Sequence, residues 1–508
     1  MTSPVVLAVD SGSSTVRTIA VELPDRIVGE GRAPVPWSHP HPGWAELDPV
    51  ALWKSVRSTI DSSLRSGGIA AARVAGVGIT SHRETVVMWD RVTGEPVHDA
   101  VVWISKQTDA IIADWQERGI GTQFRPRTGL HNDSFFSAGK VVWLLDQVPG
   151  VRARAEAGEL MVGTIDCWIL WNLTGGEVHA TDASCASRTA LFNLQRMAWD
   201  DELCAMLGIP VSLLPEVRSS DGDFGRVRAD VIETRPPVRA VVADQQSSMF
   251  GQACFDEGAV KHTLGTAGVL TQATGAAPRL IPGLTSSVAW TVQGATAFEA
   301  EGVVFHSGQT LQLLRDRLQL PVGPGDVDRL AGSVPDSAGV YLVPAFGGMA
   351  APHWNREARA SIQGLTLETR LEHLVRAAVE SMAYQVVDIV DALRDSGSVV
   401  SELKVDGGGA TSDLLCQFIA DVCDLSVLRP RELERTALGA AFIAAIGLGL
   451  MSGPEEVAAT WCVERRFDPQ LSEERRSTLL EGWRQALALT LTTRPADVPR
   501  PERPDSRL

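Results

Sequence analysis

Two short segments of this chain, about 250 residues apart, each run an apolar strand into a turn of glycine and hydroxyl residues and back into a second apolar strand. The first is residues 5–15 (VVLAVDSGSST) and the second is residues 260–268 (VKHTLGTAG). Glycine lets backbone N–H groups approach an anion closely, and Ser or Thr hydroxyls add donors, so each turn can hold phosphate oxygens. The alternative interpretation is a pair of ordinary hairpins. Two such turns in one chain favour a phosphate site.

Size and charge limit the class of protein. At 508 residues the chain is too long for one core and predicts two or more domains. A content of 44% hydrophobic and 21% charged residues is typical of a soluble globular protein. The formal net charge of -16 argues against nucleic acid as a partner, because neutralising phosphates requires clustered Lys and Arg.

Cysteine use and apolar runs indicate the compartment. The seven cysteines are scattered without C-x-x-C spacing, which predicts reduced thiols rather than disulfides or a zinc site. Asp10 interrupts the apolar start, so no signal-peptide pattern is expected. The longest apolar run, residues 437–451, is too short and too rich in Gly and Ala to cross a bilayer easily, and predicts a buried helix. We therefore expect a cytoplasmic protein with no membrane partner.

Strand patterns alternate with helical patterns, which predicts an α/β architecture. The two glycine-bearing turns suggest two domains of related design that face each other across a cleft. The expected domains are residues 1–252 and 253–490, followed by a disordered tail at 491–508 that is rich in Pro and charge. Expected strands are residues 74–80, 85–89, 240–243 and 399–405, and expected helices are residues 371–393 and 412–423.

Two aspartates are candidates for a metal beside phosphate. Asp10 and Asp244 each end an apolar strand, where open α/β sheets place their ligands. Mg²⁺ at phosphate sites is held by one or two carboxylates, phosphate oxygens and water. The alternative is a turn or cap role, which Asp often has at strand ends. No G-x-x-x-x-G-K-[ST] motif is present, so a P-loop enzyme is excluded on its own motif.

A second group of residues suits a small polyol. Arg83 and Glu84 directly follow a strand and pair five rigid donors with an acceptor-only carboxylate, which together match hydroxyls that donate and accept. The alternative is a surface ion pair. Trp103 and Phe135 can form an apolar wall behind a carbon chain, although most aromatic residues serve the core.

Several segments resemble the FGGY carbohydrate kinase family, and within it the members that phosphorylate glycerol. Residues 78–85 (GITSHRET) carry this likeness, residues 135–143 (FFSAGKVVW) resemble the first family signature, and residues 360–380 fit the second. Shorter matches lie at residues 163–166, 186–189, 244–246, 250–252, 352–354 and 406–408. Together they cover roughly residues 4 to 455 in the order of the family.

The resemblance implies a two-domain actin-like ATPase fold, also described as ribonuclease H-like, with a central nucleotide cleft. It implies an enzyme that transfers the γ-phosphoryl group of ATP to a terminal hydroxyl of glycerol, with Mg²⁺ as cofactor and a homodimer as the assembly. Asp244 matches the general base, and Asp10 with Asp244 matches the metal position.

The remaining site residues follow from the same resemblance. Positions that match nucleotide contacts are Ser13, Ser14, Thr15, Arg17, Gly265, Thr266, Gly308, Gln312, Gly408 and Ser412, the last replacing the usual Asn. Positions that match the polyol site are Arg83, Glu84, Trp103, Phe135, Asp244, Gln245 and Val269.

Departures from the family pattern gather around the polyol pocket. Phe135 replaces a Tyr that bonds a substrate hydroxyl, Val269 replaces a Phe that closes the pocket, and residues 104–108 (ISKQT) replace the usual run after Trp103. The acceptor is therefore glycerol or, alternatively, a longer polyol or sugar such as erythritol, a pentitol or a ketose. A non-enzymatic alternative is a nucleotide-regulated binding protein of actin-like fold, because fold alone does not fix function.

Overall fold

The computed structural model describes residues 3–35, 37–323 and 325–492. Its first large sheet has the strand order β14-β6-β1-β2-β3, in which β1, β2 and β3 are antiparallel neighbours and β6 and β14 run parallel to β1. The strands are β1 (Val5–Ser11), β2 (Thr15–Glu22), β3 (Arg26–Pro34), β6 (Val74–Ser81) and β14 (Val238–Ala243). The apolar side chains of β1 are fully buried, which explains its nearly continuous apolar sequence.

The second large sheet repeats this plan. Its order is β17-β18-β16-β15-β21-β22-β23, in which β15, β16 and β18 are antiparallel neighbours and β21 and β22 run parallel to β15. The strands are β15 (Val260–Leu264), β16 (Gly268–Gly275), β17 (Thr285–Val292), β18 (Ala295–Val304), β21 (Glu402–Asp406), β22 (Ser426–Pro430) and β23 (Val463–Phe467). The α/β class and the duplicated actin-like design expected from the sequence are confirmed.

Smaller sheets and helices surround these two cores. The remaining strands are β4 (Trp37–Ser38), β5 (Glu46–Leu47), β7 (Val86–Asp90), β8 (Ala100–Val101), β9 (Leu160–Thr164), β10 (Ala180–Asp182), β11 (Phe192–Asn193), β12 (Ala198–Trp199), β13 (Glu216–Arg218), β19 (Tyr341–Val343) and β20 (Ser361–Gln363). The helices are α1 (Pro49–Ser66), α2 (Asp109–Glu117), α3 (Phe124–Thr128), α4 (Ser137–Gln147), α5 (Val151–Glu156), α6 (Ile165–Thr174), α7 (Ala183–Ala186), α8 (Asp201–Leu207), α9 (Asp244–Gly251), α10 (Gly308–Asp316), α11 (Val327–Ala331), α12 (Leu371–Asp395), α13 (Asp413–Cys423), α14 (Arg435–Gly447), α15 (Pro454–Thr460) and α16 (Glu473–Thr492).

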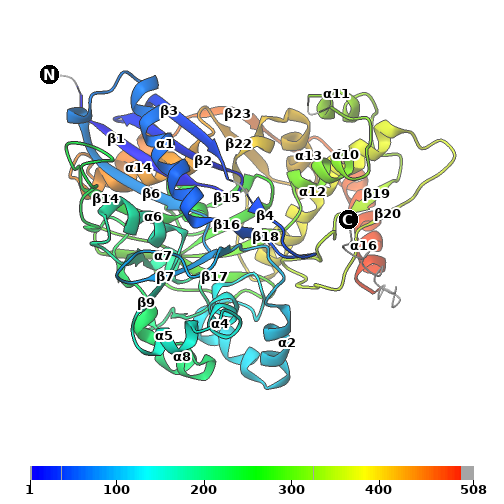
Figure 1. Cartoon of the computed structure of the whole chain (residues 1–508). Coiled ribbons are helices and arrows are strands. Elements are labelled where there is room, and N and C mark those ends of the chain that lie inside the picture. Colours follow the sequence, from blue (N-terminus) through cyan, green and yellow to red (C-terminus); the bar gives the residue numbers. More distant parts are fainter. Residues whose placement is uncertain (1–2, 36, 324, 493–508) are drawn as a thin grey trace, which may run out of the picture.

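Helix α14 comes late in the chain but lies against the first sheet, beside β1 and β6 (Figure 1). It also crosses α9 in backbone contact: a Cβ added at Gly439 would overlap the carbonyl oxygen of Ser247, and one at Gly251 would overlap that of Arg435. One apolar core accordingly contains residues from both halves, among them Val6, Val242 and Phe442. The division at residue 252 stays a proposal, and the packing of α14 crosses it.

Most predicted elements have the expected type, with shifted ends. The helix predicted at 371–393 is α12. The apolar run at 437–451 is buried in α14 as far as residue 446, but the helix ends at Gly447 and Leu450 beyond it is exposed. The strand predicted at 399–405 is β21, which begins only at Glu402. Residues 491 and 492, expected in the disordered tail, close α16, and residues 493–508 lie outside the described residues.

The seven cysteines are free thiols, and all except Cys462 are buried. Within the described residues, no helix combines the length and apolar character that a bilayer crossing requires.

The helix crossing gives a first prediction. Changing Gly439 to Ala should lower the midpoint of thermal unfolding, because the added methyl group meets the backbone of Ser247, which cannot move as freely as a side chain. Overpacking of this kind costs about 1–3 kcal/mol. The control is Gly325→Ala, where no atom lies within 4 Å of the added Cβ. Equal midpoints for the two variants would contradict the close contact.

Candidate functional site

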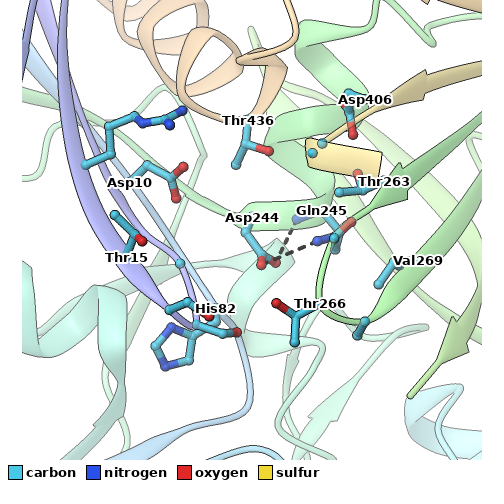
Figure 2. Close-up of a pocket in the computed structure, with 18 of the residues that line it drawn as sticks. Asp10, Thr15, His82, Asp244, Gln245, Thr263, Thr266, Val269, Asp406 and Thr436 are labelled. Atoms are coloured by element: carbon cyan, nitrogen blue, oxygen red, sulfur yellow. Dashed lines mark hydrogen bonds between the residues drawn. The ribbon is translucent and has the colours of Figure 1, made fainter. Parts of the chain in front are cut away.

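A cavity of about 540 Å³ opens between the two sheets and collects most of the predicted site residues (Figure 2). Those that line it are Asp10, Ser13, Ser14, Thr15, Arg17, Arg83, Glu84, Trp103, Phe135, Asp244, Gln245, Gly265, Thr266, Val269 and Gly408. Gly308 and Ser412 line an adjoining cavity of about 310 Å³, which shares Gly265 with the first. Gln312 is outside both linings: it is exposed on α10, one turn after Gly308.

The two glycine-bearing turns face the same cavity from opposite sheets. In the β1–β2 turn the Gly12 N–H donates to the Thr15 carbonyl at 3.1 Å, and in the β15–β16 turn the Gly265 N–H donates to the Ala267 carbonyl at 3.1 Å. Figure 2 shows Thr15 and Thr266 at the cavity from these two turns. Hydroxyls and backbone N–H groups thus surround one space, which is the arrangement that binds phosphate.

Two helices also begin at this cavity. Asp244 is the first residue of α9, and Thr436 is the second residue of α14; both line the cavity. The N-terminal end of a helix carries partial positive charge and unpaired N–H groups, so it favours an anion. The α9–α14 crossing therefore directs two helix N-termini toward the space between the turns.

Asp10 and Asp244 face this space together, as Figure 2 shows. The pKa of the Asp10 carboxyl is raised to about 7, mainly by burial and also by the negative charge of Asp244, while Arg17 opposes this. A bound divalent cation would relieve both effects, so the carboxyl pair fits Mg²⁺ held with phosphate oxygens and water. The described residues hold no group of three or more His, Cys, Asp or Glu side chains suited to a metal, so a cation bound here would take its other ligands from phosphate oxygens and water.

Arg17, a predicted phosphate contact, is tied to carboxylates in this structure. Its Nε lies 3.0 Å from Glu30 Oε1, and its Nη1 forms an ion pair with Glu434. Glu434 directly precedes α14 and lines the cavity. The guanidinium of Arg17 therefore lines the cavity while it forms ion pairs with carboxylates from both halves of the chain.

Arg83 and Glu84 belong to a buried ion network rather than to a surface pair. Arg83 Nη1 lies 2.5 Å from Glu301 Oε2, and Arg83 Nε lies 3.4 Å from Asp244 Oδ1. Arg188 joins Glu84 and Glu301 at 2.9 and 2.7 Å. Burial opposes the charge of Arg83, but Glu301, Glu84 and Asp244 raise its pKa well above the ordinary value. The network fixes Arg83 beside Asp244.

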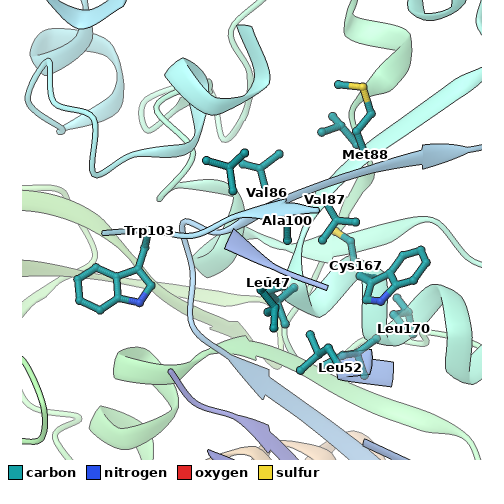
Figure 3. Close-up of a cluster of buried hydrophobic side chains, with 14 of the residues drawn as sticks. Leu47, Leu52, Val86, Val87, Met88, Ala100, Trp103, Cys167 and Leu170 are labelled. Carbon is teal, nitrogen blue, oxygen red and sulfur yellow. The ribbon is translucent and has the colours of Figure 1, made fainter. Parts of the chain in front are cut away.

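Aromatic and aliphatic side chains form the apolar side of the cavity. The rings of Trp103 and Phe135 meet edge to face, with centroids 5.6 Å apart, and Phe135 also packs on Phe305. Figure 3 shows Trp103 at one end of the buried cluster, away from the other labelled side chains. Its Nε1 donates to Ser13 Oγ at 3.1 Å, which links this wall to the first turn. Val269 and Val303, paired across β16 and β18, complete the lining.

Sequence reasoning assigned no role to several residues that line the cavity. Asp406 is the last residue of β21, and Asp10 is the next to last of β1; Asp406 Oδ2 accepts from Ser248 at 2.6 Å, while its buried Oδ1 has no hydrogen-bond partner among the described residues. Its position after an apolar strand was the available signal. His82 lies at the cavity with Nδ1 2.9 Å from the Ser11 carbonyl, so Nδ1 carries the proton and Nε2 is an acceptor. Arg188, Glu299 and Glu301 do not line the cavity and were also given no role. Arg188 lies within the matched segment 186–189, whereas Glu299 and Glu301 lie outside the matched segments.

The duplicated sheets and the cavity between them define the class of protein: two-domain proteins of the actin-like ATPase fold. The chain belongs to the FGGY family of carbohydrate kinases. The pattern described as "FGGY family of carbohydrate kinases, N-terminal domain" matches residues 5–251, and that of the C-terminal domain matches residues 260–448.

Individual relatives agree with this membership. A glycerol kinase of Stenotrophomonas maltophilia is 45% identical over 97% of this chain and 99% of its own length, and one of Aromatoleum aromaticum is 44% identical over 95% and 98%. The crystal structure of Plasmodium falciparum glycerol kinase with ADP superposes with a TM-score of 0.87 at 27% identity and covers 97% of this chain and 99% of that chain.

The raised pKa of Asp10 gives a prediction about stability and pH. The pKa is about 7 in the fold against an ordinary value of 3.8 for an aspartate, so the folded state holds one proton more between these values. Stability therefore falls as pH rises through this window, and the loss is complete above about pH 7. Changing Asp10 to Asn removes the ionisation, so without metal the variant should melt above the wild type at pH 8, with a smaller difference near pH 4. The exposed Asp25→Asn is the control, and a pH-independent difference would contradict the assignment.

Proposed function

We propose that this enzyme transfers the γ-phosphoryl group of ATP to a terminal hydroxyl of glycerol, giving glycerol 3-phosphate, ADP and a proton. The observation that carries the proposal is that one cavity gathers two kinds of chemistry. Glycine turns and the N-terminus of α14 offer donors for phosphate, the Arg83–Glu84 pair and the Trp103–Phe135 wall suit a polyol, and Asp244 and Gln245 begin α9 in the same cavity. The relatives at 44–45% identity carry the name glycerol kinase.

Asp244 is placed to act as the general base. Its Oδ1 accepts the backbone N–H of Gln245 at 2.7 Å and lies 3.4 Å from Arg83 Nε, so its orientation is fixed from two directions. Its side chain keeps 19% exposure, which leaves an oxygen accessible to an alcohol. As the attacking hydroxyl loses its proton to Asp244, Arg83 and the N-terminus of α9 stabilise the negative charge around the reaction.

Glycerol would be oriented by both charged and apolar groups. Arg83 donates to hydroxyl oxygens, the Glu84 carboxylate accepts from hydroxyl protons, and Gln245 adds an amide. Trp103 and Phe135 would cover the carbon backbone. Holding the hydroxyl near the phosphate accounts for much of the rate, because phosphoryl transfer is catalysed mainly by positioning and charge stabilisation.

The nucleotide would span the two adjoining cavities. The turns that contain Ser13, Ser14, Thr15, Gly265 and Thr266 would hold its phosphates, with Arg17 beside them, and the neighbourhood of Gly308, Gly408 and Ser412 would receive the nucleoside. The Ser412 hydroxyl also caps α13 and donates to Asp328 at 2.8 Å. Mg²⁺ would be held near Asp10 and Asp244, where it neutralises phosphate charge. Gln312 would need a change of position to take part.

A longer acceptor is the second candidate, and the pocket lining favours it at two positions. Phe135 offers no hydroxyl to a substrate, and Val269 is a small side chain at the lining. Together with residues 104–108, these differences favour a larger polyol or a ketose over strict selection of glycerol. Turnover with glycerol, tetritols, pentitols and ketoses separates the two candidates, since a higher kcat/KM for a longer compound selects the second.

We also propose a cytoplasmic location and a homodimer. Seven free thiols, six of them buried, fit a reducing compartment. The dimer rests on the family resemblance alone, and light scattering of the purified chain tests it.

Removing the proposed base gives a clear expectation. Asp244→Asn should lower kcat by at least about 100-fold, because general base catalysis contributes 10² to 10⁴. ADP affinity, measured by calorimetry, should stay close to that of the wild type. Asp256→Asn makes the same chemical change at an exposed position and should leave kcat unchanged. Turnover retained by Asp244→Asn would remove this residue from the role.

Restoring a hydroxyl to the wall tests the substrate. Phe135→Tyr should lower the KM for glycerol about two- to tenfold, since one neutral hydrogen bond contributes about 0.5–1.5 kcal/mol. The KM for ATP should not change, and it serves as the internal control. A KM for glycerol that is unchanged or raised would show that glycerol does not lie against this ring.

A further inference from the structure

Lys261 is a fully buried cation beside the proposed catalytic pair. It lies on β15 with no exposed surface, and its Nζ donates to Gln245 Oε1 at 2.7 Å and to Thr263 Oγ1 at 2.9 Å. Among the described residues it has no carboxylate within ion-pair distance. Burying a charge without an ion-pair partner is unfavourable, so we expect the buried Lys261 to have a role that offsets this cost.

The contact with Gln245 decides which way the amide of that residue faces. An ammonium group has three donors and no acceptor, so only the amide oxygen of Gln245 can face Lys261. The Gln245 Nε2 group then faces Asp244, 3.4 Å from its Oδ2, as the dashed lines in Figure 2 show. With the amide reversed, its oxygen would face the Asp244 carboxylate and repel it. Lys261 therefore determines that Gln245 presents its NH₂ group, a hydrogen-bond donor, to the cavity.

The other bond of Lys261 leads toward the nucleotide side. The Ser248 hydroxyl donates its single proton to Asp406 Oδ2 at 2.6 Å. Thr263 Oγ1, which lies 3.3 Å from Ser248 Oγ, must therefore donate its own proton to Ser248. Thr263 in turn accepts from Lys261. Each donor in this series points away from Lys261. A directed series of hydrogen bonds therefore connects Lys261 through Thr263 and Ser248 to Asp406, which also lines the cavity.

The neighbouring strand contains a matched lysine without this contact. Lys404 on β21 is the register partner of Lys261 on β15. Its Nζ donates to the carbonyl oxygens of Gln252 and Ala253 at 2.8 and 3.1 Å, just beyond the far end of α9. The two lysines thus lie side by side, but only Lys261 reaches the end of α9 that begins at the cavity.

We propose that Lys261 is a positioning residue that holds the Gln245 amide with its NH₂ group toward Asp244 and the acceptor alcohol. The inference rests on the proposed function, because it assigns the substrate-facing donor of that site. Lys261 itself does not contact the substrate in this proposal.

Kinetics of Lys261→Met and Lys404→Met test the assignment. Lys261→Met should raise the KM for glycerol about two- to tenfold, the effect of losing one oriented neutral hydrogen bond, and should leave ADP affinity within about twofold. Lys404→Met should leave both values unchanged. If glycerol proves not to be the acceptor, the same comparison uses the polyol that the wild type turns over fastest.

A double-mutant cycle separates orientation from a general structural effect. In a Gln245→Ala background the amide is absent, so adding Lys261→Met should change the KM by less than about twofold. If the factors by which the two substitutions raise the KM multiply in the double variant, the proposal is overturned, because Lys261 would then act independently of Gln245.

Two further measurements keep the proposal testable if Lys261→Met does not fold or if no polyol is turned over. Gln245→Glu keeps an oxygen for Lys261 but removes the donor, so it should fold and should raise the KM; wild-type KM would overturn the proposal. The NMR signal of the Gln245 side-chain amide, identified by its absence in Gln245→Ala, reports on the contact with Lys261 and requires no turnover. In the wild type its protons should exchange slowly with water, and fast exchange there would overturn the proposal.

Discussion

The backbone contact between α9 and α14 is the constraint on which the site depends. Gly251 and Gly439 allow the two helices to touch at their main chains, and no larger residue fits at either position without displacement of backbone. Each helix follows a strand of a different sheet, yet both begin at the same cavity. The crossing thus determines that an aspartate from one half of the chain and a threonine from the other face a common anion site.

Buried charged groups fix the geometry of another part of the cavity. Arg83 and Arg188 come from the first half of the chain, and both pair with Glu84 of that half and with Glu301 on β18 of the second sheet. Ion pairs of this kind add little stability, because desolvation offsets their attraction, but removing one partner leaves an uncompensated charge. Their effect here is geometric: they hold the Arg83 guanidinium against Asp244 in one orientation.

The sequence allowed prediction of what is encoded locally. An apolar strand that runs into a glycine turn is a local pattern, so the sequence predicted both turns together with Asp10 and Asp244. It also predicted the Arg83–Glu84 pair, which directly follows a strand. In the structure all of these residues line one cavity. Partners distant along the chain left no such pattern: Glu301 joins Arg83 across more than 200 residues, and the cover that α14 gives to the first sheet follows from packing. Gln312, predicted as a nucleotide contact, is exposed on α10 outside both cavity linings, and its position depends on how that helix leaves Gly308.

The late position of α14 has a consequence for synthesis on the ribosome. Strand β14 is complete about 190 residues before α14 begins, so the apolar face that α14 covers stays open during this interval. At about 5–20 residues per second the wait is about 10–40 s. The first sheet therefore matures only after nearly the whole chain has emerged, and during that time its uncovered face is a natural substrate for chaperones.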